Sequence, residues 1–250
     1  WARFGVKCER FGQLGSMPNR GYFPFAAVSG GGCTWAAMLE APYSWQMELY
    51  KEKETCALSG GLADYEYGHW CKEIPAGGGF KTHRAYIRVK RTENIDEVCN
   101  DFVRFQDNRL SVPESEESMP VVFNEYCTTW GTPSEENSLS ILESIRGLPI
   151  GIFVIDAGWY LPENSGWGNA VGDWVPSKKL FPRGIESVVS AINGAGMRAG
   201  VWFEFENVGS DSSKYDDAEL LLKRNGIPVT GQSRRGFDLR SERVQAYLKT

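Results

Sequence analysis

The chain has 250 residues, of which 42% are hydrophobic, 24% charged and 13% aromatic, a composition that excludes disordered, collagen-like and coiled-coil proteins. Its 27 Lys and Arg residues against 32 Asp and Glu residues give a formal net charge of −5, so no diffuse basic field is present to bind nucleic acid or an anionic membrane. No stretch approaches the roughly 20 apolar residues that cross a bilayer. We therefore expect neither nucleic acid nor a membrane as a partner.

Cysteine and histidine are too scattered to predict a metal site. The six cysteines lie 15 to 28 positions apart, and the two histidines are His69 and His83. A zinc site needs closely spaced ligand pairs, which this sequence lacks. We expect no metal and no cofactor. Scattered cysteines in a chain of this size are typical of buried free thiols, which favours a reducing compartment and a cytoplasmic location.

The first region consists of short apolar or alternating runs separated by glycines. This pattern is typical of antiparallel β-structure and predicts part of a β-sandwich. The helical spacing of apolar residues then predicts a helix from Asn94 to Arg109. The expected strands are Tyr22 to Val28, Cys33 to Leu39, Tyr43 to Leu49, Cys56 to Leu62 and Ala85 to Val89. The acidic, proline-bearing stretch that follows predicts a linker over residues 111–119.

From Pro120 the pattern changes to strands that alternate with helices, which predicts a parallel sheet. In the first helix, Thr132 is the expected N-cap, and Glu135 is the expected capping-box residue. The strands are expected at Val121 to Tyr126, Ile150 to Ile155 and Met197 to Phe205, and the helices around Leu139 to Ile145, Pro182 to Ile192, Tyr215 to Arg224 and Glu242 to Leu248.

Three parallel strands cannot close a barrel, and the sequence ends within a predicted helix at Thr250. We therefore expect the chain to be a piece of a longer protein. Its expected fold is a β-sandwich portion followed by an α/β region.

Acidic and aromatic residues follow all three predicted parallel strands, where the active sites of α/β folds lie. A carboxylate beside aromatic rings suits a sugar, because hydroxyls bind charged acceptors and the C–H face of the ring packs on an aromatic face. Asp156 follows Ile155 directly and is a candidate, although an acid there can also cap a turn. Glu204 and Glu206 share one side of a strand by their spacing, and either a buried pair or a functional pair explains them. Trp202 and Phe203 face opposite ways, so only one of them lines a site.

Three segments resemble the first half of the catalytic barrel of family 36 glycoside hydrolases, the α-galactosidases. They are PVVFNEYCTTWGTPSEEN, FVIDAGWY and GDWVPSKKLFPRGIESVVSAINGAGMRAGVWFEFENVG. Residues 1–110 resemble the last part of the β-sandwich that precedes that barrel. The resemblance implies that residues 120–250 form the first three βα units of a (β/α)8 barrel. It also implies double displacement with retention on a terminal α-linked sugar, with one carboxylate as nucleophile and another as acid/base.

The resemblance also implies roles for individual residues. Asp156 matches the first acid of the Asp-Asp-Gly-Trp motif that binds sugar hydroxyls, whereas the second acid is replaced by Ala157, which puts strict galactose specificity in question. Trp202 matches a tryptophan near the sugar, and Tyr126 lies where many members carry a stacking tryptophan. The pair Arg234 and Arg235 lies near a substrate-contacting arginine.

Both catalytic carboxylates of the family lie on later strands, so we expect them beyond Thr250 and expect the 250-residue chain alone to be inactive. The expected partner is an oligosaccharide or glycoside substrate, and self-association into a homo-oligomer stays open. A carbohydrate-binding protein without catalysis is one alternative. An α-galactosyl transglycosylase is another, which differs in how the acceptor site excludes water.

Overall fold

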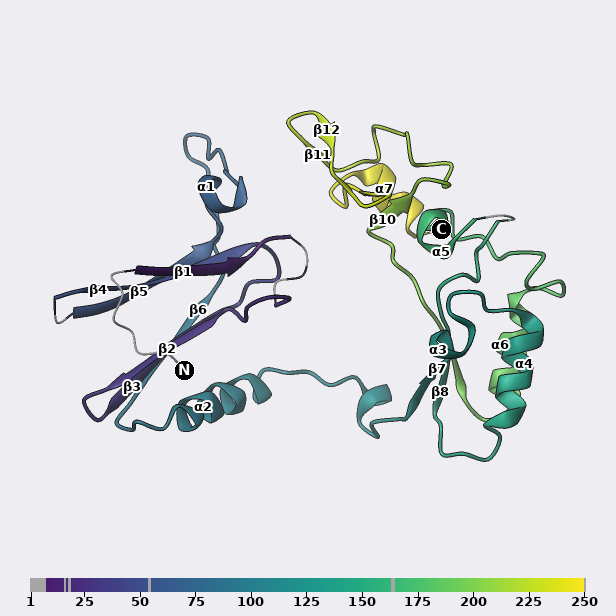
Figure 1. Cartoon of the computed structure of the whole chain (residues 1–250), viewed down its shortest axis with the longest axis horizontal. Coiled ribbons are helices and arrows are strands. Elements are labelled where there is room, and N and C mark those ends of the chain that lie inside the picture. Colours follow the sequence, from purple (N-terminus) through teal and green to yellow (C-terminus); the bar gives the residue numbers. More distant parts are fainter. Residues whose placement is uncertain (1–7, 16, 18, 54, 163–164, 250) are drawn as a thin grey trace. The chain divides into compact units, whose positions relative to one another are not determined.

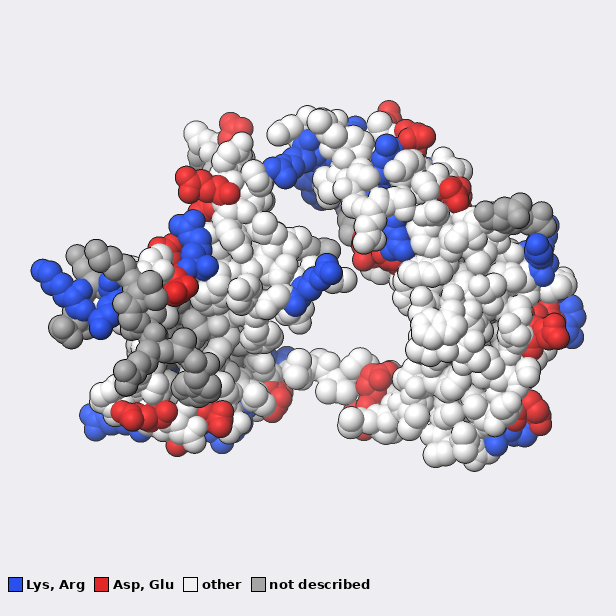
Figure 2. Space-filling model, viewed as in Figure 1, with Lys and Arg blue, Asp and Glu red and all other residues white. Residues whose placement is uncertain are grey.

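The computed structural model describes residues 8–249 except 16, 18, 54, 163 and 164. The chain divides into two compact units, Trp1–Ser111 and Val112–Thr250, which we call unit 1 and unit 2. Acidic and basic side chains are interspersed on the face of each unit that Figure 2 shows, so neither unit presents a large patch of one sign there. Among the described residues, no helix is long and apolar enough to cross a membrane.

Unit 1 contains two three-stranded antiparallel sheets (Figure 1). One sheet has the order β1-β4-β5 and the other β2-β3-β6. The strands are β1 (Cys8–Gln13), β2 (Phe25–Gly30), β3 (Cys33–Leu39), β4 (Trp45–Glu52), β5 (Thr55–Leu62) and β6 (Ala85–Lys90), and the helices are α1 (Tyr65–Gly68) and α2 (Ile95–Asp107). The predicted strands and the predicted helix are all present, and β1 is an addition to them. Its sequence, CERFGQ, carries two charges and a glycine in six residues, so its composition did not predict a strand.

The central strand β3 joins two hydrophobic clusters because its side chains alternate between the two faces of the sheet. Ala37 and Leu39 pack with Trp45 and Met47 of the other sheet, which gives the sandwich its interior. Ala36 and Met38 point the other way and pack against α2. Unit 1 is therefore a β-sandwich portion with a helix on one outer face.

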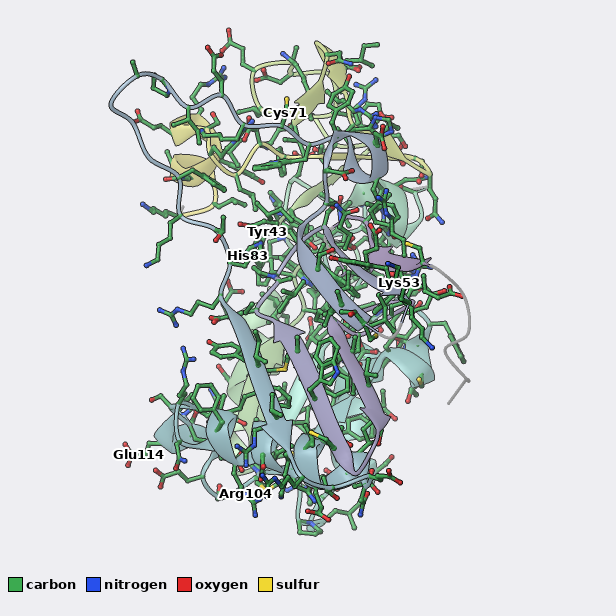
Figure 3. All side chains as sticks on the ribbon, turned by 90° about the vertical axis from the view of Figure 1, so that its left-hand side faces the viewer. Tyr43, Lys53, Cys71, His83, Arg104 and Glu114 are labelled. Carbon is green, nitrogen blue, oxygen red and sulfur yellow. The ribbon has the colours of Figure 1, made fainter. Side chains whose placement is uncertain are left out.

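Asp101 of α2 forms ion pairs with basic side chains on that outer face. Its carboxylate lies 2.7 Å from Nε of Arg88 and 3.5 Å from Nζ of Lys90. It also accepts from Arg104 of the same helix, 2.5 Å away and labelled in Figure 3. Hydrogen bonds from Arg104 and Arg88 lower the pKa of Asp101 to about 2. This ion network ties α2 to β6.

Unit 2 begins with a parallel sheet of order β7-β8-β9. The strands are β7 (Val122–Asn124), β8 (Ile152–Ile155) and β9 (Arg198–Val201), and the helices that connect them include α3 (Tyr126–Thr129), α4 (Glu135–Ser144), α5 (Trp167–Ala170) and α6 (Ile185–Gly194). Helices α4 and α6 cover one face of the sheet (Figure 1). Phe153 and Ile155 of β8 are fully buried under these helices, in one cluster with Val188 and Ile192.

The N-cap of α4 is Ser134, whereas the sequence predicted Thr132. The Ser134 hydroxyl accepts a hydrogen bond from the Asn137 N–H at 3.1 Å, which satisfies one of the free donors in the first turn. Glu135 is not a capping-box residue either. It reaches across to Arg183, whose backbone N–H donates to its carboxylate. The cap therefore lies two residues later than predicted.

The helix predicted from Tyr215 to Arg224 is wrong. Residues 211–220 form turns, and a small β-structure follows them. The Leu222 N–H donates to the Gly236 carbonyl and the Leu222 carbonyl accepts from Val229, so long-range pairing replaces the helical bonds. The remaining elements are β10 (Asn207–Gly209), β11 (Lys223–Arg224), β12 (Ile227–Pro228), β13 (Thr230–Gly231), β14 (Arg234–Gly236) and α7 (Glu242–Tyr247). Leu220 and Leu221 belong to the cluster that these elements bury.

The stretch predicted as a linker, residues 111–119, holds one short 3-10 turn, η1 (Glu114–Glu116). The Ser115 carbonyl accepts a hydrogen bond from the Arg198 guanidinium at 3.2 Å. All six cysteines are free, and Cys8, Cys71 and Cys127 are exposed. The expectation of buried thiols is therefore wrong for these three, which lie outside the hydrophobic clusters.

Candidate substrate site

An open pocket of about 340 Å³ lies where the parallel strands of unit 2 end. The carboxyl ends of parallel strands meet at one edge of a sheet, and this geometry brings together residues far apart in the sequence. The last residue of β7 and the segments after β7, β8 and β9, together with α5, supply the lining. The lining residues are Asn124, Tyr126, Cys127, Asp156, Ala157, Trp167 and Trp202.

Asp156 is the acidic residue of this pocket. It is 8% exposed, and its Oδ1 accepts a hydrogen bond from the Ala157 N–H at 2.7 Å. Its Oδ2 accepts from the Asn124 side-chain amide. No described residue forms an ion pair with it. Because these donors are neutral, no cation among the described residues occupies the carboxylate, and its spare lone pairs can accept from a hydroxyl-bearing ligand.

Glu125 lies directly behind Asp156, and the sequence analysis did not single it out. It is fully buried, and its Oε1 accepts the Asp156 N–H at 2.9 Å. The Thr129 hydroxyl donates to Oε2. Burial raises the pKa of Glu125, and the hydrogen bonds from Thr129 and the Asp156 N–H oppose that rise. The one available signal was position, since Glu125 lies near the end of the strand predicted from Val121 to Tyr126, but an acid beside Asn124 and Tyr126 is typical of an exposed loop.

Three aromatic rings frame the pocket. Tyr126 meets Trp167 with ring centroids 6.1 Å apart and an interplanar angle of 89°. Trp167 meets Trp202 at 5.8 Å and 87°. Trp202 lines the pocket, as the sequence predicted for one of the two neighbouring aromatics, whereas Phe203 is half-exposed and packs against Trp159. Trp167 is the first residue of α5, and the sequence analysis did not single it out.

Glu204 and Arg234 form an ion pair behind Trp167. Arg234 Nη1 lies 2.7 Å from both carboxylate oxygens of Glu204, and its Nε donates to the Gly168 carbonyl at 2.8 Å. The guanidinium carbon lies 5.0 Å from the centroid of the Trp167 ring. Strand β9 ends at Val201, so the predicted pairing of Glu204 with Glu206 on one strand face is wrong. Glu206 is exposed.

Arg235 points away from this arrangement because neighbouring residues of a strand face opposite sides. Its Nη1 donates to the Tyr215 carbonyl and to the Asp216 carboxylate, and its guanidinium carbon lies 4.0 Å from the centre of the Tyr215 ring. Arg235 does not line the pocket. Of the two predicted arginines, Arg234 contacts a lining residue and Arg235 does not.

The turn after Asp156 is held by close backbone packing. Ala157 is 1% exposed, lines the pocket and occupies the position where the resemblance implies a second acid. Gly158 has a φ of +104°, and a Cβ atom there would lie 2.0 Å from the Gly131 carbonyl oxygen. Only glycine fits this position. In the described part of the chain, no three His, Cys, Asp or Glu residues cluster so as to hold a metal ion.

Known proteins with similar sequences are α-galactosidases. Alpha-galactosidase 1 of Pediococcus pentosaceus is 22% identical over 83% of this chain, and the match spans 29% of that protein. A probable alpha-galactosidase G of Aspergillus terreus is 27% identical over 93% of this chain and is matched over 35% of its length. The chain therefore spans about a third of the length of these relatives.

The fold is also that of solved α-galactosidases. The α-galactosidase AgaB from Geobacillus stearothermophilus has a TM-score of 0.79 at 18% identity, covering 97% of this chain and 34% of that one. The enzyme from Lactobacillus brevis has a TM-score of 0.77 at 22% identity, with 97% and 33% covered. The sequence profile described as melibiase matches residues 80–249, more than half of the chain. The chain belongs to the melibiase family.

Proposed function

We propose that the pocket of unit 2 binds the terminal sugar of an α-galactoside and that the complete protein hydrolyses the glycosidic bond. The observation that carries this proposal is Asp156, a carboxylate that no cation of the described residues pairs with and that lies among three aromatic rings at the carboxyl edge of a parallel sheet. Its oxygens suit hydroxyl groups, and Trp167 and Trp202 offer apolar faces for the C–H side of a sugar ring.

The reaction we propose is double displacement with retention. One carboxylate attacks the anomeric carbon while a second carboxylic acid protonates the leaving oxygen, and water then releases the sugar from the covalent intermediate. Asp156 does not take either role in this scheme. It holds the sugar hydroxyls, and the two reacting carboxylates belong to strands that follow β9 in the family.

The proposed architecture follows the same reasoning. Strands β7, β8 and β9 would be the first strands of a (β/α)8 barrel, preceded by the end of a β-sandwich in residues 1–110 and a linker in residues 111–119. The parallel order and the helices on one face support this architecture. Oligosaccharides are the proposed substrates, since AgaA variants from Geobacillus stearothermophilus have been solved in complex with raffinose and with stachyose.

The test replaces Asp156 in the complete protein. A charged acceptor contributes roughly 1.5 to 3 kcal/mol per hydrogen bond, so Asp156→Ala should lower kcat/KM for an aryl α-galactoside by at least about tenfold to hundredfold. Asp216→Ala is the matched control, because that side chain is 88% exposed and lies outside the pocket. If Asp156 only caps a turn, stability falls by about 1 kcal/mol while the kinetics stay unchanged. Sugar binding without turnover would identify a carbohydrate-binding protein instead.

Ala157 decides which sugar fits. We propose that the missing acid leaves room for a substituent that galactosidases of the family do not admit. Ala157→Asp should shift the ratio of kcat/KM values toward aryl α-galactoside and away from aryl α-N-acetylgalactosaminide. An unchanged ratio would show that the Ala157 side chain does not face the sugar.

A further inference from the structure

A fully buried carboxylate is costly unless strong hydrogen bonds compensate for lost hydration. Glu125 is such a group, with 0% of its surface exposed. Both of its oxygens are used, one by the Asp156 N–H and one by the Thr129 hydroxyl. No described residue supplies a cation to it. A neutral side chain would fill this space with a smaller desolvation penalty. The carboxylate oxygens are therefore expected to have a specific function as hydrogen-bond acceptors.

The backbone shows what that purpose is. The Glu125 N–H donates to the Val154 carbonyl at 3.3 Å, which continues the pairing of β7 with β8 by one residue. The Glu125 carbonyl then accepts from the N–H groups of Thr128 and Thr129 at 2.8 and 3.1 Å, because the chain turns into α3. The next donor of the neighbouring strand, the Asp156 N–H, is met by the Glu125 side chain at 2.9 Å.

We propose that Glu125 is a positioning residue that fixes the Asp156 backbone so that the Asp156 carboxylate faces the sugar. Where β7 ends, the Glu125 backbone carbonyl turns toward α3 and no longer pairs with β8. The Glu125 carboxylate accepts the Asp156 N–H in place of that carbonyl. It anchors the first residue of the Asp156–Gly158 turn, while Thr129 holds the other oxygen and so fixes the Glu125 rotamer. This inference rests on the proposed function of Asp156 as the sugar-binding acid.

The experiment measures the Kd of 1-deoxygalactonojirimycin for the complete protein and its variants. Glu125→Met keeps the volume and removes the acceptor, and we expect binding to weaken about tenfold or more. Glu125→Gln keeps an oxygen for the Asp156 N–H, and we expect it to stay within about threefold of the wild type. Thr128→Val is the matched control. The Thr128 side chain is exposed, and the group that donates to Glu125 is its backbone N–H, which the substitution keeps, so the Kd should stay within about threefold.

A double-mutant cycle separates positioning from general destabilisation. If Glu125 acts through Asp156, Glu125→Met should weaken binding little further in the Asp156→Ala background. A full additional loss there, or wild-type affinity in Glu125→Met alone, would overturn the inference. Should Glu125→Met not fold, Glu125→Asp replaces it, because the shorter side chain keeps the charge but withdraws from the Asp156 N–H, and it should also bind more weakly. Wild-type affinity of Glu125→Asp would overturn the inference in the same way.

The two proposals fail differently. No binding of the probe by the wild-type protein would overturn the proposed function together with this inference. Binding that Asp156→Ala weakens and Glu125→Met leaves unchanged would overturn the inference alone.

Discussion

The two units differ in the partners that surround a partly buried carboxylate. In unit 1, Asp101 lies among three cations, Arg88, Lys90 and Arg104, that neutralise it and join a helix to a sheet. In unit 2, Asp156 and the Glu125 carboxylate behind it receive hydrogen bonds from backbone N–H groups, an amide and a hydroxyl. Cations of the fold pair with Asp101, whereas neutral donors surround Asp156 at the edge of an open pocket.

The sheets explain the difference. In unit 1, Asp101 of α2 faces Arg88 and Lys90 of the antiparallel strand β6, so its charge is paired locally where the helix packs on the sheet. Parallel strands end together, and their last residues converge on one pocket. The contrast predicts that replacing the Asp101 carboxylate changes stability, while replacing the Asp156 carboxylate changes binding.

The largest effect is expected where the pocket depends on backbone contact. Gly158→Ala places a Cβ atom 2.0 Å from the Gly131 carbonyl oxygen at a φ of +104°. We expect a loss of more than about 3 kcal/mol in the free energy of unfolding, measured by urea titration. Gly30→Ala in β2 is the control, since no atom lies within 4 Å of its added Cβ. Similar losses in both variants would show that the close approach of Gly131 to Gly158 does not set the cost of the substitution.

Asp101→Asn should lower the melting temperature of unit 1 because three ion pairs lose their shared partner. Calorimetry measures this change. The kcat/KM for an aryl α-galactoside should stay that of the wild type, which is the reverse of the outcome expected for Asp156→Ala. A changed kcat/KM in Asp101→Asn would show that the ion network of α2 affects the substrate site.

The two neighbouring arginines of β14 test whether only the one that contacts a pocket-lining residue affects substrate binding. Arg234→Lys cannot keep both the Nη1 contacts to Glu204 and the Nε hydrogen bond to the Gly168 carbonyl, and it loses the guanidinium contact with the Trp167 ring, because an ammonium lacks the planar fork. We expect KM for the galactoside to rise about twofold to fivefold. Arg235→Lys, on the opposite face of the strand, should leave KM unchanged. Equal effects in steady-state kinetics would contradict the assignment of Arg234 alone to the pocket.

The smallest effects are expected from pH, and their signs are opposite in the two units. Burial raises the pKa of Glu125, so its contribution to stability is present below its unfolded pKa and is lost as pH rises through the raised value. Cations lower the pKa of Asp101 to about 2, so its contribution is present above its unfolded pKa and is lost as pH falls through that value.

Melting curves at several pH values check both signs. The melting temperature of Glu125→Gln relative to wild type should rise between about pH 4 and pH 7. The deficit of Asp101→Asn relative to wild type should shrink as pH falls from about 4 toward 2. Parallel pH trends in the two variants would show that both carboxylates experience the same kind of environment.

The sequence predicted those features of the fold and the site that depend on residues adjacent in the chain. Asp156 follows the apolar strand that ends at Ile155, and its place at the strand end could be predicted from that order alone. The parallel sheet and helices α4 and α6 followed from periodicity in the same way. Helix α2 was predicted from its apolar spacing as well.

Long-range pairing accounts for what the sequence missed. Residues 215–224 carry a helical pattern, yet Leu222 pairs with Gly236 and Val229 from later in the chain. Glu125 is buried because its side chain meets a backbone donor on another strand, a contact that spans 31 positions. The partners of Arg234 and Arg235 depend on which face of β14 each occupies, and the doublet itself does not reveal this.

The perpendicular indoles at the pocket have an optical consequence. The rings of Trp167 and Trp202 lie 5.8 Å apart at 87°, close enough for their electronic transitions to couple. Coupled, non-parallel chromophores give a paired circular dichroism band whose amplitude depends steeply on their mutual angle. A ligand that settles between the rings and Asp156 disturbs that angle directly, so the unlabelled protein carries a spectroscopic reporter at the place where the sugar is expected.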